Sequence, residues 1–81
     1  MRLKDKNVII TGSGAGIGKA TALRFAEEGA RVMVVDVNGD DAKKTAQMLR
    51  DAGGQAEYQQ ADVSDPKAIE RVVQATISSF G

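Results

Sequence analysis

The sequence lacks cysteine and histidine, the residues that most often cross-link small domains or bind zinc in them. Its 81 residues include no cysteine, no histidine and no tryptophan, only one proline, and as aromatic residues one tyrosine and two phenylalanines. The absence of cysteine excludes a disulfide framework and a thiolate zinc site. The length suffices for one small domain, residues 1–81, which buries a modest share of its surface and is marginally stable alone.

An excess of charge and long apolar runs are also missing. Eleven basic residues balance eleven acidic ones, so the net charge is zero. This balance argues against nucleic acid as a partner, because such a partner favours a basic surface, and it gives little protection against self-association. No apolar run approaches the length of a membrane span, and residues 1–6 do not resemble a signal peptide. We therefore expect a soluble, cytoplasmic protein with no membrane partner.

The most informative stretch is Val8–Gly18, which reads V-I-I-T-G-S-G-A-G-I-G. Its first three residues form a short apolar run that ends at a glycine cluster, as in a strand buried on both faces. Glycines then recur at every second position from 12 to 18, and good helix formers follow without a break as far as Gly29. The stretch therefore predicts a strand, a tight glycine turn and the start of a helix.

A turn of this kind can bind an anion. The first amides of a helix have no intrahelical partner, and the helix dipole adds partial positive charge there. Gly12 would make the tight exit from the strand, Gly16 would let a pyrophosphate approach the backbone, and Gly18 would let the helix pack closely on the sheet. The alternative is a glycine-rich structural turn that binds nothing.

The rest of the chain alternates between strand and helix patterns. Strands are predicted over residues 7–11, 30–36 and 55–60, and helices from residue 16 or 17 to 28, over 40–52, and from 66 toward the end. Asn38 and Asp65 are the expected caps of the second and third helices, and Gly29 and Gly53 the expected stops of the first and second. The third helix has one apolar face, formed by Ile69, Val72, Val73, Thr76, Ile77 and Phe80.

This order predicts an α/β fold with a three-stranded parallel sheet. Strands that alternate with helices over short connections pair in parallel through right-handed crossovers. We expect the strand order 3-2-1, with the first two helices on one face of the sheet and the third helix on the other. The arrangement is half of a doubly wound nucleotide-binding fold.

Asp36 is the second chemical signal. It lies 18 residues beyond Gly18, at the carboxyl end of the second predicted strand. An acid at this distance can accept hydrogen bonds from the ribose hydroxyls of an adenosine. It would repel a 2′-phosphate, and no arginine or lysine stands at positions 13, 15, 37 or 38 to attract one. NAD is therefore favoured over NADP, the alternative being a solvated acid at a strand end.

Two further residues invite a chemical interpretation. Asp62, followed by Val63, ends the third strand and could accept a hydrogen bond from an adenine amino group, although a plain loop acid fits the spacing too. Lys19 suggests a phosphate-binding loop of the G-x-x-x-x-G-K-[ST] type, but Ser13 stands where its first glycine belongs and Ala20 where its hydroxyl belongs. We interpret Lys19 as a solvated helix residue.

At this point the sequence resembles the short-chain dehydrogenase/reductase family. Residues 11–18 resemble its T-G-x-x-x-G-[IL]-G motif, Asp62-Val63 its adenine-contacting pair, and Asp36 its NAD-selecting acid. Residues 52–56 and 65–66 are similar to the 3-oxoacyl-reductase-like branch. The resemblance implies a Rossmann fold, an NAD(P) cofactor, usually a homotetramer, and hydride transfer between the cofactor and a carbonyl or alcohol. The expected cofactor-binding residues are Gly12, Ser13, Gly14, Gly16, Ile17, Gly18, Asp36, Asp62 and Val63.

The sequence departs from the family where catalysis is concerned. The family uses a Tyr-x-x-x-Lys pair with an upstream serine, but the only tyrosine here is Tyr58, and Asp62 stands four residues later. We therefore expect a portion truncated before the catalytic residues, with no catalytic or metal-binding residue, that binds NAD without catalysing a reaction. The alternative is a self-assembling structural fragment that pairs as a homodimer through the bare edge of its first strand.

Overall fold

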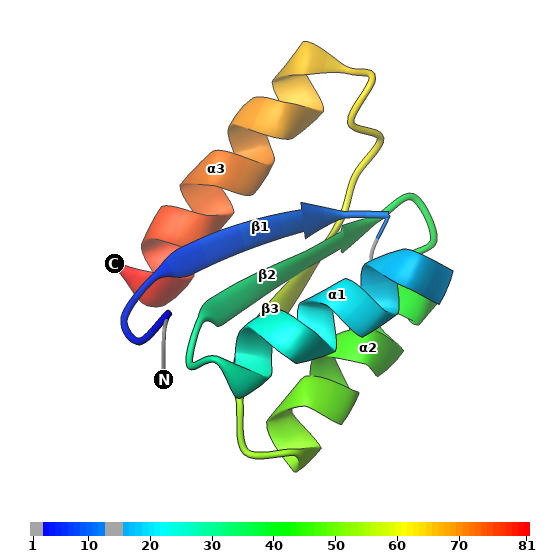
Figure 1. Ribbon diagram of the computed structural model, residues 1–81. Coiled ribbons are helices and arrows are strands. Elements are labelled where there is room, and N and C mark those ends of the chain that lie inside the picture. The colour runs from blue at the N-terminus through cyan, green and yellow to red at the C-terminus, as the bar shows by residue number, and fades with distance from the viewer. Residues whose placement is uncertain (1–2, 13–15) are drawn as a thin grey trace.

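The computed structural model describes residues 3–12 and 16–81, in which three strands alternate with three helices (Figure 1). In chain order these are β1 (Asn7–Thr11), α1 (Gly16–Glu27), β2 (Arg31–Asp36), α2 (Gly39–Asp51), β3 (Gln55–Gln60) and α3 (Pro66–Phe80). The predicted α/β class is confirmed. The predicted bounds of β1 and β3 match. Those of α1 and β2 differ by one residue at one end, and those of α2 by one residue at both ends.

The sheet is parallel and its register is uniform. The strand order is β1-β2-β3, which is the predicted order read from the other side. In both ladders each residue pairs with the one 24 positions further along the chain, so that Asn7 faces Arg31 and Arg31 faces Gln55. The carboxyl ends of the three strands therefore meet at one edge of the sheet, which we call the carboxyl edge.

Helices cover both faces of the sheet, as predicted. Figure 1 shows α1 and α2 on one face and α3 on the other. Val32 and Val34 belong to the core on the side of α1 and α2, together with Leu49, whereas Met33 and Val35 pack with Val72 of α3. Alternate residues of β2 thus serve opposite faces, and the strand is buried from Val32 to Val35.

The prediction that Val8–Ile10 is buried on both faces is wrong. Only Ile10 is buried, Val8 is half-buried, and the Ile9 side chain is 38% exposed. β1 pairs with one neighbour, so it is an edge strand of the described sheet. The apolar runs of β1 and β2 look alike in sequence, but burial on both faces also requires strands on both sides, and only β2 has them.

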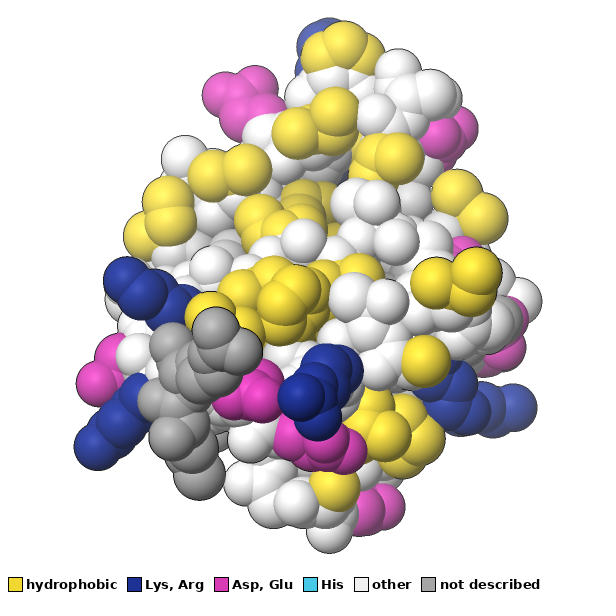
Figure 2. All heavy atoms as spheres, in the orientation of Figure 1, with side chains coloured by type: hydrophobic (Ala, Val, Ile, Leu, Met, Phe, Trp, Pro, Cys, Tyr) yellow, Lys and Arg dark blue, Asp and Glu magenta, His cyan; other side chains and the backbone are white. Residues whose placement is uncertain are grey.

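The apolar face predicted for α3 is divided in the structure. Val72 and Thr76 are buried with Ala68 against the sheet, and the Thr76 hydroxyl donates to the Val72 carbonyl at 2.8 Å. Ile69 and Ile77 are 45% and 54% exposed. Figure 2 shows hydrophobic side chains gathered over α3 and β1 on this side. The predicted face is therefore correct as a pattern but only half of it packs on the sheet.

The predicted helix ends are confirmed. Asn38 Oδ1 accepts the Asp41 N–H at 3.1 Å at the start of α2, and Asp65 Oδ1 accepts the Lys67 N–H at 3.0 Å at the start of α3. Gly29 and Gly53 follow α1 and α2 with φ of 93° and 92°. This left-handed backbone ends a helix and favours glycine.

Candidate functional site

The candidate residues gather at the carboxyl edge of the sheet. Gly12 directly follows β1 and Asp36 ends β2. Thr11 of β1 pairs with Val35 of β2. The residues that follow them, Gly12 and Asp36, are therefore neighbours at this edge. Asp62 lies two residues beyond Gln60, which faces Asp36. Gly12 and Asp36, 24 positions apart, and Asp36 and Asp62, 26 positions apart, are thereby brought to one edge of the sheet.

Two glycines of the turn have the backbone conformation that the motif predicts. Gly12 has φ of 62° and Gly16, the first residue of α1, has φ of 60°. A Cβ built on either would meet no described atom within 4 Å, so the left-handed backbone, and not lack of space, favours glycine here. The predicted contacts of Ser13 and Gly14 lie outside the described residues.

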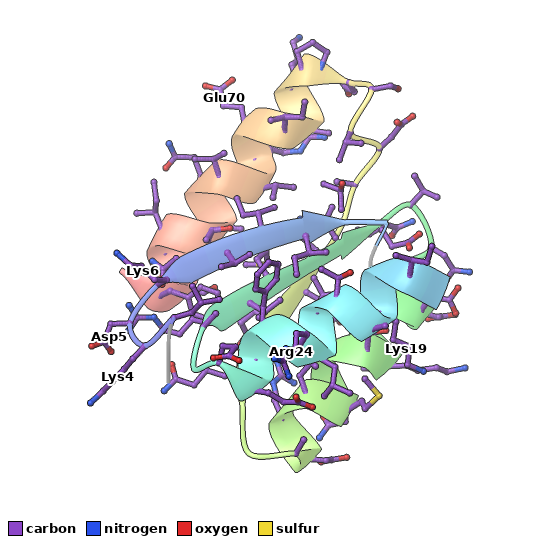
Figure 3. The ribbon with its side chains drawn as sticks, in the orientation of Figure 1. Lys4, Asp5, Lys6, Lys19, Arg24 and Glu70 are labelled. Atoms are coloured by element: carbon purple, nitrogen blue, oxygen red, sulfur yellow. The ribbon has the colours of Figure 1, made fainter. Side chains whose placement is uncertain are left out.

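The start of α1 is suited to a negatively charged ligand. The helix begins at this edge, and its first turn contains no acidic residue. The Ile17 side chain is 87% exposed, whereas Gly18 is half-buried. Lys19 is exposed near the same end (Figure 3). Amides at the start of a helix, with the positive end of its dipole, favour an anion such as a phosphate.

The Asp36 carboxylate is held by the turn that follows it. Its Oδ1 accepts the backbone N–H of Asn38 at 3.0 Å. The main-chain carbonyl of Asp36 accepts the Ala61 N–H at 3.0 Å, which ties the end of β2 to the residue after β3. Gln60 Nε2 donates to the Val37 carbonyl at 3.1 Å. Gln60 was not predicted from the sequence, because a glutamine at a strand end carries no signal of its own there.

The Asp62 carboxyl group is turned toward its own loop. Its Oδ1 accepts both the Ser64 hydroxyl at 2.7 Å and the Ser64 N–H at 3.0 Å. These two hydrogen bonds, the hydroxyl first, lower the pKa of Asp62 below its ordinary value. Asp62 is therefore an acceptor at neutral pH, and the described donors both use the same oxygen.

Val63 lines an apolar cleft between β1 and α3. The cleft has a volume of about 290 Å³, and the side chains of Ile9, Thr11, Ile69, Val72 and Val73 complete its lining. Val63 itself is 42% exposed. Thr11 ends β1 and Val63 follows β3, so these two lining residues lie at the carboxyl edge. A flat apolar group could lie against Val63 there.

The opposite end of the sheet carries structural polar contacts. Arg31 Nε donates to Asn7 Oδ1 at 2.7 Å, and its Nη2 donates to the Asp5 carbonyl at 2.8 Å. Figure 3 shows Lys4, Asp5 and Lys6 at this end, away from Lys19. In the described ranges, 3–12 and 16–81, no three side chains form a group that could hold a metal, and no helix is long and apolar enough to cross a bilayer.

Comparisons with known proteins agree with this geometry. The "short chain dehydrogenase" family matches residues 6–81. The chain is 48% identical over 68 residues to an oxidoreductase of Bacillus subtilis, covering 84% of this chain and 25% of that protein. It is 40% identical over 81 residues to the 7α-hydroxysteroid dehydrogenase of Escherichia coli, covering 100% of this chain and 32% of that protein.

A solved structure of a 7α-hydroxysteroid dehydrogenase, complexed with NADH and 7-oxo glycochenodeoxycholic acid, matches the fold with a TM-score of 0.95 at 40% identity. The match covers 99% of this chain and 31% of that one. The chain thus spans about a third or less of the length of these relatives. None of these findings supports the alternative of a self-assembling structural fragment. With its sequence motif, its fold and its matches in agreement, the chain belongs to the short-chain dehydrogenase family.

Proposed function

We propose that this chain is the NAD(H)-binding portion of a short-chain dehydrogenase, and that the carboxyl edge holds the adenosine and pyrophosphate of the cofactor. The observation that carries the proposal is the register of β1 and β2, which makes Gly12 and Asp36 neighbours. A pyrophosphate and a ribose are joined in a dinucleotide, so their binding groups must also be adjacent.

Each group of candidate residues has its own role in this proposal. The backbone of Gly12 and Gly16 and the first amides of α1 bind the pyrophosphate, with Ser13, Gly14, Ile17 and Gly18 completing that contact. Asp36 accepts hydrogen bonds from the ribose 2′- and 3′-hydroxyls. The adenine lies against Val63, and its amino group donates to Asp62. The low pKa of Asp62 supports this last contact, because an ionised carboxylate only accepts.

The charge of Asp36 favours NAD over NADP. The carboxylate and a 2′-phosphate would be like charges in contact, which costs binding free energy of several kcal/mol at desolvated contacts. The turn after Asp36, residues 37–39, offers no basic side chain to offset this repulsion. We therefore expect NADPH to bind more weakly than NADH, by a factor of about ten or more.

Hydride transfer between the nicotinamide and a carbonyl or alcohol is the reaction that we propose for the whole protein. Bound NAD would supply the hydride acceptor. The 81 residues contain no Tyr-x-x-x-Lys pair. The only tyrosine, Tyr58 of β3, lies beside Lys43 and Arg50 of α2. We expect this chain alone to bind the cofactor and to show no turnover above background.

A titration with NADH, followed by fluorescence, tests the binding. We expect saturable binding by the wild-type chain, about tenfold weaker binding by Asp36→Asn, and a smaller difference between NADH and NADPH in that variant. Asp51→Asn is the matched control, because Asp51 ends α2 at the opposite edge of the sheet. If NADH does not saturate the wild-type chain at millimolar concentration, the proposal is wrong.

A further inference from the structure

Gln60 is the next side chain beside Asp36 at the carboxyl edge. The two residues face each other in the register of β2 and β3. Side chains alternate along a strand, so Asp36 lies on the same face of the sheet as Val32 and Val34, and Gln60 on the same face as Ala56. That face is the one covered by α1 and α2. Gly12, Asp36 and Gln60 thus end one row across the sheet.

A single peptide group connects Gln60 to the Asp36 carboxylate. Gln60 Nε2 donates to the Val37 carbonyl at 3.1 Å, and the Asn38 N–H donates to Asp36 Oδ1 at 3.0 Å. The Val37 carbonyl and the Asn38 N–H belong to the same peptide unit, which is planar, so they point in opposite directions and rotate together. The bond from Gln60 therefore fixes the direction in which the Asn38 N–H points.

Gly39 makes room for this arrangement. A Cβ built on Gly39 would lie 3.1 Å from Gln60 Oε1, 3.2 Å from its Cδ and 3.3 Å from its Cβ. Contacts this short would force the glutamine side chain to move. The absence of a side chain at position 39 thus leaves Gln60 the space that it occupies beside the turn.

The main chain on either side of this peptide is anchored independently of Gln60. Asn38 caps α2, because its side chain accepts the Asp41 N–H at 3.1 Å and its carbonyl accepts the Ala42 N–H at 3.1 Å. The Asp36 carbonyl accepts the Ala61 N–H at 3.0 Å. The peptide between Val37 and Asn38 lies between these anchors, and Gln60 donates to its carbonyl.

We propose that Gln60 is a positioning residue for ribose recognition: it holds the 37–38 peptide so that the Asn38 N–H keeps the Asp36 carboxylate in place for the ribose hydroxyls. The inference rests on the proposed function, because it assigns to Asp36 the ribose of a nucleotide. Gln60 itself need not touch the ligand, and its effect passes through Asp36.

The first test needs no ligand. In Gln60→Leu the donor is lost, and we expect the Asn38 amide to exchange with solvent about fivefold faster in a hydrogen-exchange NMR experiment, the change expected from the loss of one hydrogen bond. Gly39→Ala, which displaces the same side chain, should speed Asn38 exchange similarly. Gln55→Leu, at the other end of β3, is the matched control and should leave it unchanged. Equal Asn38 exchange in wild type and Gln60→Leu would overturn the proposal.

The second test separates the ribose from the phosphates. For the wild-type chain we expect AMP to bind more tightly than 2′,3′-dideoxy-AMP. In Gln60→Leu this ratio should fall about fivefold, while the affinity for inorganic pyrophosphate stays the same, because the glycine turn is intact. A general loosening of the fold would weaken all three ligands together. If Gln60→Leu keeps the wild-type ratio of the affinities for AMP and 2′,3′-dideoxy-AMP, the proposal is overturned.

The two tests also separate this proposal from the proposed function. If the wild-type chain binds neither AMP nor pyrophosphate, the nucleotide function is wrong and the ribose role falls with it, while the exchange of the Asn38 amide still decides whether Gln60 holds the peptide. If AMP binds with a clear preference over its dideoxy analogue but Gln60→Leu keeps that preference, the nucleotide function stands and Gln60 has no positioning role.

Discussion

Gly16→Ala separates the backbone requirement of the glycine turn from its role in binding. Gly16 has φ of 60°, and a Cβ there would meet no described atom within 4 Å. The cost of the alanine is therefore that of a left-handed backbone alone, about 1–2 kcal/mol of unfolding free energy. Gly53 has φ of 92° and equally open surroundings, but it lies after α2 at the opposite edge of the sheet. Gly53→Ala is thus a control of the same chemistry.

Urea unfolding followed by circular dichroism measures the stability cost, and an NADH titration measures binding. We expect both variants to lose about 1–2 kcal/mol of unfolding free energy. Only Gly16→Ala should bind NADH about tenfold more weakly, because in the proposed site its methyl group would lie between the backbone and the pyrophosphate. An unchanged unfolding free energy in Gly16→Ala would refute the conformational argument. An equal loss of NADH affinity in Gly53→Ala would refute the location of the site.

Three further predictions concern the framework around the site. Ser64→Ala removes the larger cause of the low pKa of Asp62, so carboxyl NMR should show this pKa rising toward its ordinary value. A carboxyl group with a lowered pKa stabilises the fold above its unfolded-state pKa and loses that effect as the pH falls through the folded one, so acid should destabilise Ser64→Ala less steeply than wild type. Leu49→Ala, at a fully buried position, should cost about 2–5 kcal/mol in urea unfolding. Asp65→Ala removes the cap of α3 and should cost about 1 kcal/mol in the same experiment.

The fold was predictable from local patterns because each helix and strand carries its own signal. Asn38 and Asp65 precede helices in the sequence and cap them in the structure. The burial of β1 was not predictable in the same way, since Ile9 and Val34 stand in similar apolar runs. Ile9 is 38% exposed and Val34 is fully buried, because only β2 is paired on both sides. Tertiary context decided this difference.

The candidate site was predictable where a residue acts through its own type and spacing. The positions of Gly12 and Asp36 could be predicted, because the carboxyl ends of neighbouring parallel strands meet at the same edge of a sheet. Gln60 could not, because glutamine at the end of an edge strand is usually solvated. Its connection to Asp36 passes through the 37–38 peptide, whose orientation is a property of the folded backbone.

The lengths of the elements are compatible with the uniform register. β2 has six residues and extends about 20 Å, and the 13 residues of α2 also extend about 20 Å. A helix as long as the strand returns the chain to the amino edge of the sheet, so that the next strand begins level with the last. Both ladders have the same offset of 24 residues, although α1 is one residue shorter than α2. Because of this equal offset, Gly12, Asp36 and Gln60, which are far apart in the chain, lie in one row at the carboxyl edge.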